Sequence, residues 1–138
     1  MSWDGYIEHL MVDLPHGGKL KASAIVGQDG GVWAQSSDFP AVTPEQVAAL
    51  MAGLASMAEL GHAGDLGGTG IRLGDQKYQV APSPGDPTVL RGKSLDGGCC
   101  IKKTHTALVI GTYVEPVTPG DCNNIVENMA DYLLGMQY

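Results

Sequence analysis

Long apolar runs and an excess of basic residues are both missing from this sequence. No apolar segment approaches the roughly 20 residues that a membrane-spanning helix needs. Lysine and arginine together number 8, against 15 aspartates and glutamates, and the formal net charge is −7. This charge argues against nucleic acid as a partner, because nucleic-acid-binding domains typically carry a basic stripe. The first residues, Met1 to Gly5, lack the basic and apolar regions of a signal peptide, so we expect an intracellular protein.

Cysteine is scarce, and its placement is poor for cross-linking. The three cysteines are Cys99, Cys100 and Cys122, an odd number that includes an adjacent pair. Adjacent cysteines rarely bridge each other, and no Cys-x-x-Cys or Cys/His spacing indicates zinc. We therefore predict reduced thiols and no metal. A thiol-based enzyme stays as an alternative, and it predicts a thiol that reacts at neutral pH. Cys122 lies near a predicted helix start, where its pKa could be lowered, but a buried inert thiol is favoured.

Two glycine-rich strings resemble phosphate-binding motifs, but neither has all the features that such a motif requires. Gly92-Lys93-Ser94 resembles the end of a P-loop, but Pro87 stands where the upstream glycine is required. The glycine-rich stretch 67–70 precedes a predicted strand, so it lacks the helix N-terminus that binds phosphate. We expect a protein that is not an enzyme and has no cofactor.

The 138 residues fit a single domain, 1–138, of the α+β class. Thr43-Pro44 with Gln46, and Thr118-Pro119 with Asp121, are typical helix starts, and apolar residues recur at helical spacing after each. Short strands broken by glycine and proline favour an antiparallel sheet. We predict the N- and C-terminal helices on one face of this sheet and a further helix on the other. The expected helices are 2–13, 44–60 and 119–136, and the expected strands are 19–27, 31–35, 70–73, 77–81, 88–91, 99–103 and 107–113.

Most of the eight aromatic residues lie near the chain ends or in the first predicted hairpin. Trp3 and Tyr6 share a helix face, Trp33 lies on an early strand, and Tyr132 and Tyr138 lie at the far end. Proline-rich peptides form a preformed extended helix that docks on grooves of exposed aromatic rings. The pattern is consistent with such a groove. The alternative is that these rings simply fill the core.

Several strings, in order along the whole chain, resemble profilin, and the plant and green-algal branch most closely. Clear examples are Ala24-Ile25-Val26-Gly27 followed by Val32-Trp33-Ala34-Gln35, and Glu115-Pro116-Val117-Thr118-Pro119-Gly120. Others are Met1-Ser2-Trp3 with Tyr6, Arg91-Gly92-Lys93, Ile101-Lys102-Lys103-Thr104 and Asp131-Tyr132-Leu133. The segments 63–70 and 81–88, the pair Cys99-Cys100 and the final Tyr138 depart from the plant pattern.

The resemblance implies a mainly monomeric, cytoplasmic protein of the cytoskeleton that binds monomeric actin and regulates its polymerisation. It also implies proline-rich partners such as formins, and phosphatidylinositol 4,5-bisphosphate as a further ligand. The proline-binding residues carried over are Trp3, Tyr6, Trp33, Tyr132, Leu133 and Tyr138. Those for actin are Lys77, Arg91, Lys93, Val117, Thr118, Gly120, Asn123 and Glu127, and those for phosphoinositide are Arg91, Lys93, Lys102 and Lys103. A rival hypothesis is a regulatory or sensory module on a similar sheet, which predicts that Trp3 and Trp33 are buried.

Overall fold

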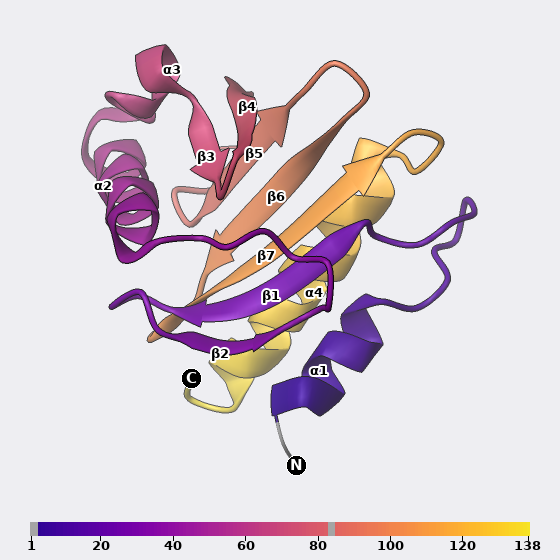
Figure 1. Ribbon diagram of the computed structural model, residues 1–138. Coiled ribbons are helices and arrows are strands. Elements are labelled where there is room, and N and C mark those ends of the chain that lie inside the picture. The colour runs from indigo at the N-terminus through magenta and orange to yellow at the C-terminus, as the bar shows by residue number, and fades with distance from the viewer. Residues whose placement is uncertain (1–2, 83–84) are drawn as a thin grey trace.

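The computed structural model describes residues 3–82 and 85–138, which form one curved sheet with helices on both faces (Figure 1). The helices are α1 (Trp3–Leu10), α2 (Pro44–Leu60), α3 (Leu66–Thr69) and α4 (Pro119–Gly135). The strands are β1 (Ala22–Gly27), β2 (Val32–Gln35), β3 (Ile71–Leu73), β4 (Gln76–Ala81), β5 (Val89–Lys93), β6 (Gly97–Lys103) and β7 (Ala107–Val114). Within the described residues, no helix is both long enough and apolar enough to cross a membrane.

The sheet has the strand order β2-β1-β7-β6-β5-β4-β3, and each neighbouring pair is antiparallel. Consecutive strands form hairpins, as their short connections predict, except β2 and β3, which are separated by α2 and α3 and lie at opposite edges of the sheet. The long-range pairing in the described sheet is that of β1 with β7, in register from Ala22 opposite Thr112 to Gly27 opposite Ala107. This pairing brings the first hairpin beside the strand that leads into α4, and so places the two ends of the chain near each other.

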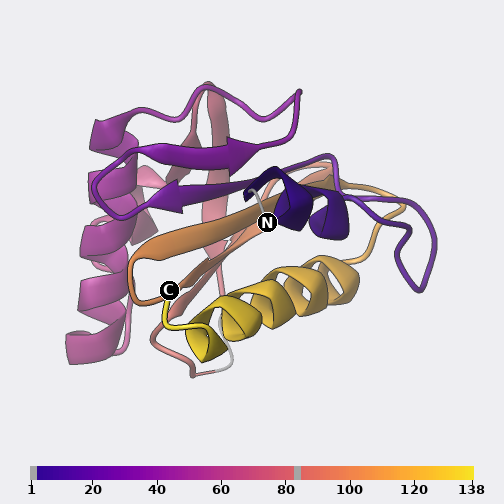
Figure 2. The ribbon, with the colours of Figure 1, turned by 90° about the horizontal axis from the view of Figure 1, so that it is seen from below.

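Each face of the sheet has its own core, and the helices divide between the faces as predicted. α1 and α4 cover one face, and α2 covers the other (Figure 2). Side chains alternate between the two sides along each strand. On β6, for example, Cys100 belongs to the core under α1 and α4, whereas Cys99 and Ile101 belong to the core under α2.

Both predicted helix starts are confirmed. The Thr43 hydroxyl accepts a hydrogen bond from the Gln46 backbone at the start of α2, and the Gln46 side chain accepts one from the Thr43 backbone. The Gln46 amide also binds the backbone of Gly74, which ties the helix to the β3–β4 turn. Thr118 caps α4 in the same way through the backbone of Asp121. These caps satisfy backbone groups that a helix end would otherwise leave unpaired.

The structure differs from the predicted elements in several places: β1 begins at Ala22 instead of residue 19, and β5 ends at Lys93 instead of residue 91. The first helix ends at Leu10 instead of residue 13, and its predicted cap, Ser2, lies outside the described residues. The short helix α3 was not predicted; its Leu66 packs where Gly53 of α2 has no side chain, so distant packing stabilises it. β6 begins at Gly97, two residues early, because these glycines lie directly against Tyr113 of β7.

Candidate functional site

Five aromatic rings from three separate parts of the chain form one continuous cluster. Trp3 of α1 lies at its centre, with ring centroids 4.7 Å from Trp33 on β2, 4.9 Å from Tyr138 and 5.2 Å from Tyr6. Tyr6 in turn lies 6.0 Å from Tyr132 of α4. Tilted and edge-on pairs at these distances are favourable because the edge of one ring meets the face of the next. The five aromatic residues of the predicted proline-binding set therefore lie together in the fold, and their ligand stays a prediction.

The cluster is partly open to solvent. Tyr132 is 52% exposed and Tyr138 is 40% exposed, while Trp3 and Trp33 are half-buried. The half-burial of both tryptophans contradicts the rival hypothesis of a sensory module, which required them to be buried. Beside the rings, Tyr6, His9, Met129 and Tyr132 line a hollow of about 290 Å³ between α1 and α4.

Leu133 does not join this surface. Its side chain is fully buried in the core beneath α4, because it lies on the helix face that packs against the sheet. The sequence reasoning grouped it with Tyr132, but neighbouring helix residues point about 100° apart and so face different surroundings. Leu133 therefore supports the cluster from below and cannot contact a docked peptide directly. Tyr6 is only 7% exposed, and its hydroxyl donates to the sulfur of Met136 at 3.8 Å.

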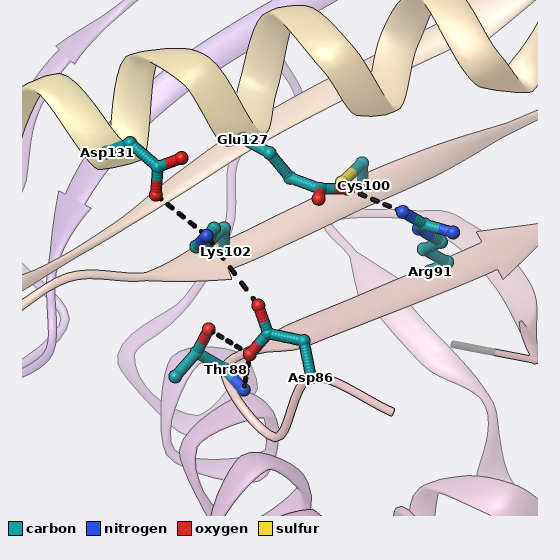
Figure 3. Close-up of polar contacts among 7 residues, drawn as sticks. All are labelled: Asp86, Thr88, Arg91, Cys100, Lys102, Glu127 and Asp131. Carbon is teal, nitrogen blue, oxygen red and sulfur yellow. Dashed lines mark hydrogen bonds and ion pairs between the residues drawn. The ribbon is translucent and has the colours of Figure 1, made fainter. Parts of the chain in front are cut away.

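A second surface combines the outer strands of the sheet with the first half of α4. Arg91 and Lys93 of β5 point to the α4 side, and β4 continues this side of the sheet with Lys77. The Arg91 guanidinium donates a 2.7 Å hydrogen bond to the carboxylate of Glu127 (Figure 3). Burial opposes the charge of Arg91, but the hydrogen bond and the charge of Glu127 outweigh it and raise the pKa of Arg91. We call this area, with Thr118, Gly120 and Asn123, the strand–helix surface.

Val117, the apolar residue predicted for this surface, is buried instead. It is 6% exposed and contacts Gly18, where a side chain would come within 2.9 Å of it. The exposed apolar residue of this region is Leu95, at the tip of the β5–β6 hairpin, which has no contact that shields it from solvent. The backbone of Glu115 donates to Asp96 at 2.8 Å, so the hairpin tip lies next to the start of α4. Sequence reasoning missed Leu95 because nothing in the sequence distinguishes an exposed leucine in a turn from a buried one.

The start of α4 is held by a contact that the sequence did not predict. The carboxylate of Asp121 accepts one hydrogen bond from the backbone of His16 at 3.0 Å and shares another with its imidazole at 2.9 Å. These bonds hold the pKa of the Asp121 carboxyl below its usual value. They also fasten the loop between α1 and β1 to the helix that carries Thr118 and Asn123.

Comparison with known proteins agrees with this arrangement. The family model for profilin matches residues 1–138. The chain belongs to the profilin family. Its structure superimposes on profilin IB of Acanthamoeba castellanii with a TM-score of 0.81 and 32% identity, covering 99% of this chain and 100% of that one. Schizosaccharomyces pombe profilin gives a TM-score of 0.79 and 31% identity over 99% and 100% of the two chains.

A third similar structure is that of a complex. Mouse profilin IIa, in complex with a double repeat from the FH1 domain of mDia1, matches with a TM-score of 0.74 and 25% identity over the whole of both chains. The profilin family and the fold, with terminal helices on one face of the sheet, are thus confirmed. The placement in the plant and green-algal branch stays a prediction.

In this profilin, two of the four residues predicted to bind phosphoinositide are already engaged in ion pairs. Lys102 is 8% exposed and donates to Asp131 of α4 at 2.8 Å, with Asp86 at 3.7 Å on its other side (Figure 3). Burial opposes its charge, but Asp131 and Asp86 outweigh this effect and raise the pKa of Lys102. Arg91 is paired with Glu127. Only Lys93 and Lys103 of the predicted set have no ion-pair partner within the described residues.

The three thiols of this profilin are buried and unpaired with one another. Burial raises the pKa of Cys100 to about 12, with the nearby charge of Glu127 adding to the effect. Burial likewise raises the pKa of Cys99 and that of Cys122 well above their usual values. A thiol enzyme needs a thiolate near neutral pH, so this alternative loses its support. Within the described residues, no cluster of three or more His, Cys, Asp or Glu side chains could hold a metal ion.

Proposed function

We propose that this protein binds actin monomers on the strand–helix surface and proline-rich segments of partner proteins on the aromatic cluster. It acts as a cytoplasmic regulator of actin polymerisation, by binding instead of by catalysis. The observation that carries the proposal is the aromatic cluster, which joins α1, β2 and the C-terminal residues in one partly exposed surface. Family membership adds the expectation of actin as the second partner.

The cluster suits a proline-rich ligand for physical reasons. Such a peptide is already extended when free, so it loses little entropy on binding. Its flat pyrrolidine rings stack well on tryptophan and tyrosine, and the free carbonyls of the peptide accept hydrogen bonds from Trp N–H and Tyr O–H groups. Because the rings pack against one another before the ligand arrives, little side-chain order has to be gained. The FH1 segment in the mouse profilin complex supports a formin-type partner.

The two surfaces lie at different places along α4. Thr118 and Asn123 are at its start, whereas Tyr132 is near its end, and the 17-residue helix measures about 25 Å. One molecule then holds actin on the strand–helix surface while its aromatic cluster is bound to a tethered partner. Delivery of actin by such a bridge gains from the high effective concentration that tethering creates.

Phosphoinositide binding is a weaker part of the proposal. Lys93 and Lys103 supply unpaired positive charge, but Lys102 and Arg91 would have to give up their carboxylate partners. The net charge of −7 repels an anionic membrane. We expect weak attachment that salt abolishes.

Tryptophan fluorescence tests the proline-binding part directly. Trp3 and Trp33 are the only tryptophans, and both belong to the cluster, so titration with poly-L-proline should shift or quench the emission in a saturable way. Flat emission up to high peptide concentration contradicts the proposal. For the other surface, excess protein should slow the spontaneous assembly of pyrene-labelled actin, and unchanged assembly would exclude monomer sequestration.

A further inference from the structure

The main-chain oxygen of the last residue is held by three hydrogen bonds from a single turn. This turn joins β6 to β7. Thr106 donates to the oxygen of Tyr138 from its backbone N–H at 2.7 Å and from its hydroxyl at 2.7 Å. The hydroxyl of Thr104 adds a third bond at 3.1 Å. The backbone N–H of Tyr138 donates to Leu133 at 2.9 Å, so both polar ends of this residue are fixed.

The turn itself is anchored to the sheet and not to α4. The backbone of Thr104 donates to Ala107 at 2.8 Å, and the Thr104 hydroxyl accepts from the Ala107 backbone at 3.0 Å. Gln28, in the β1–β2 turn, donates from its side chain to the oxygen of Thr104 at 2.8 Å and from its backbone to that of Thr106 at 3.1 Å. Thr104 is 2% exposed. The sheet therefore presents the buried hydroxyl of Thr104 and the exposed hydroxyl of Thr106 to the residues that follow α4.

The residues that follow α4 need such an anchor. The helix ends at Gly135, and Gln137 has a positive φ of 71°, which turns the chain back toward the sheet. End residues that are not tied down are usually poorly ordered. Yet the ring of Tyr138 lies edge-on to Trp3 at 4.9 Å, at the centre of the aromatic cluster. The hydrogen bonds from the turn thus connect the position of an exposed ring to a rigid part of the fold.

We propose that Thr106, together with Thr104, is a positioning residue for proline-rich ligands: it holds Tyr138 against Trp3 so that the aromatic cluster is complete before the ligand binds. This inference rests on the proposed proline-binding function. Thr106 makes no contact with the ligand itself. Its effect passes through Tyr138, whose ordering would otherwise be a cost of binding.

A double-mutant cycle in the full chain tests this role. Thr106→Val removes the hydroxyl donor but keeps the shape and the backbone N–H. We expect it to weaken poly-L-proline binding about 3- to 10-fold, as for the loss of one hydrogen bond. In a Tyr138→Ala background the same substitution should change affinity by less than about 1.5-fold, because its route of action is gone. Thr106→Ser should bind like the unsubstituted protein because it restores the hydroxyl.

Two results would overturn the proposal: unchanged affinity in Thr106→Val, or an equal loss in both backgrounds. Thr69→Val is the matched control, because the Thr69 hydroxyl also bonds a backbone oxygen, that of Asp65 at 3.1 Å, but lies on α3, under the opposite face of the sheet. It should leave proline binding unchanged. If the unsubstituted protein binds no proline peptide, the proposed function fails. The positioning of Tyr138 is then measured by the tryptophan emission of the free protein, which Thr106→Val must shift and Thr106→Ser must not.

Discussion

Arg91 and Glu127 face each other across the junction between the sheet and α4, with 2.7 Å between guanidinium nitrogen and carboxylate oxygen. Each side chain is 23% exposed, so water screens the attraction between the two charges only in part. The pair fixes the distance between β5 and α4 in the middle of the strand–helix surface. Arg91 and Glu127, which the family resemblance assigned to actin binding, thus also bind each other and contribute to the stability of the fold.

Replacing either residue should lower the stability of the protein. We expect Arg91→Ala and Glu127→Ala each to lower the free energy of unfolding by about 1 kcal/mol, because partly exposed ion pairs contribute about that much. The double substitution should cost less than the sum of the two, and urea denaturation measures this coupling. Lys93→Ala is the control for stability, because Lys93 is exposed and has no ion-pair partner among the described residues. Additive losses would show that the pair contributes nothing.

Leu95 gives a test of the proposed actin surface that does not disturb the fold. It is fully exposed at the β5–β6 tip, and Leu60 at the end of α2 is 65% exposed on the other side of the sheet. Because binding would bury the new carboxylate without a partner, Leu95→Asp should weaken actin binding about 10-fold or more. Leu60→Asp should not. Leu95→Asp should unfold at the same temperature as the unsubstituted protein, whereas Leu60→Asp should be slightly less stable because it places a negative charge at the C-terminus of α2. Equal actin affinity in all three proteins would remove Leu95 from the interface.

The buried thiols predict a loss of stability at alkaline pH. The unfolded chain releases thiol protons near pH 8.5, whereas the folded protein keeps them, with the pKa of Cys100 raised to about 12. Folding stability is therefore complete below about pH 8.5 and falls as pH rises toward 12, because the folded state binds more protons than the unfolded one. Each thiol contributes a slope of up to about 1.4 kcal/mol per pH unit.

Chemical denaturation at pH 8, 9 and 10 measures this slope, and Cys100→Ala should make it shallower. Burial also raises the pKa of Tyr78 to about 12, which adds a similar slope above pH 10. At pH 8 the native protein should resist a thiol reagent that modifies all three cysteines in urea. Rapid modification of the native protein would instead revive the thiol-enzyme alternative.

Vesicle binding should be weak and depend on few residues. In the described part of the chain, Lys93 and Lys103 are the members of the predicted lipid set without an ion-pair partner, so Lys93→Ala with Lys103→Ala should abolish any attachment to phosphatidylinositol 4,5-bisphosphate vesicles. Raising the salt from 50 to 300 mM should have the same effect, because the Debye length shortens. Co-sedimentation measures both. Attachment that survives the double substitution would locate the lipid site elsewhere.

Features that depend on neighbouring residues were predictable from the sequence. The capping residues Thr43 and Thr118 act within one helical turn, and so both long helices were placed correctly. The hairpin between β1 and β2 follows from the glycines that close its turn. The aromatic cluster could be predicted because aromatic residues are few and the family pattern placed them together.

Features that depend on how a helix docks on the sheet were not predictable. The pairs Arg91–Glu127 and Lys102–Asp131 join residues 36 and 29 positions apart, and their contact follows from the docking angle of α4. The burial of Leu133 has the same origin, since helical spacing gives its relation to Tyr132 but not which face meets the core. The helix α3 is too short to have a periodic pattern of its own, and its packing, with Leu66 against Gly53, is tertiary.

The aromatic cluster joins the first and last elements of the chain, with Tyr6 and Met136 in contact across 130 positions of sequence. During synthesis, α1 is complete long before α4 leaves the ribosome, so a nascent chain exposes Trp3 and Tyr6 without the rings that complete the surface. The cluster is therefore complete only after Tyr132 and Tyr138 have been synthesised and have packed against α1. If the cluster binds proline-rich segments as proposed, a copy that lacks α4 and Tyr138 should compete poorly with a folded copy for the same partner.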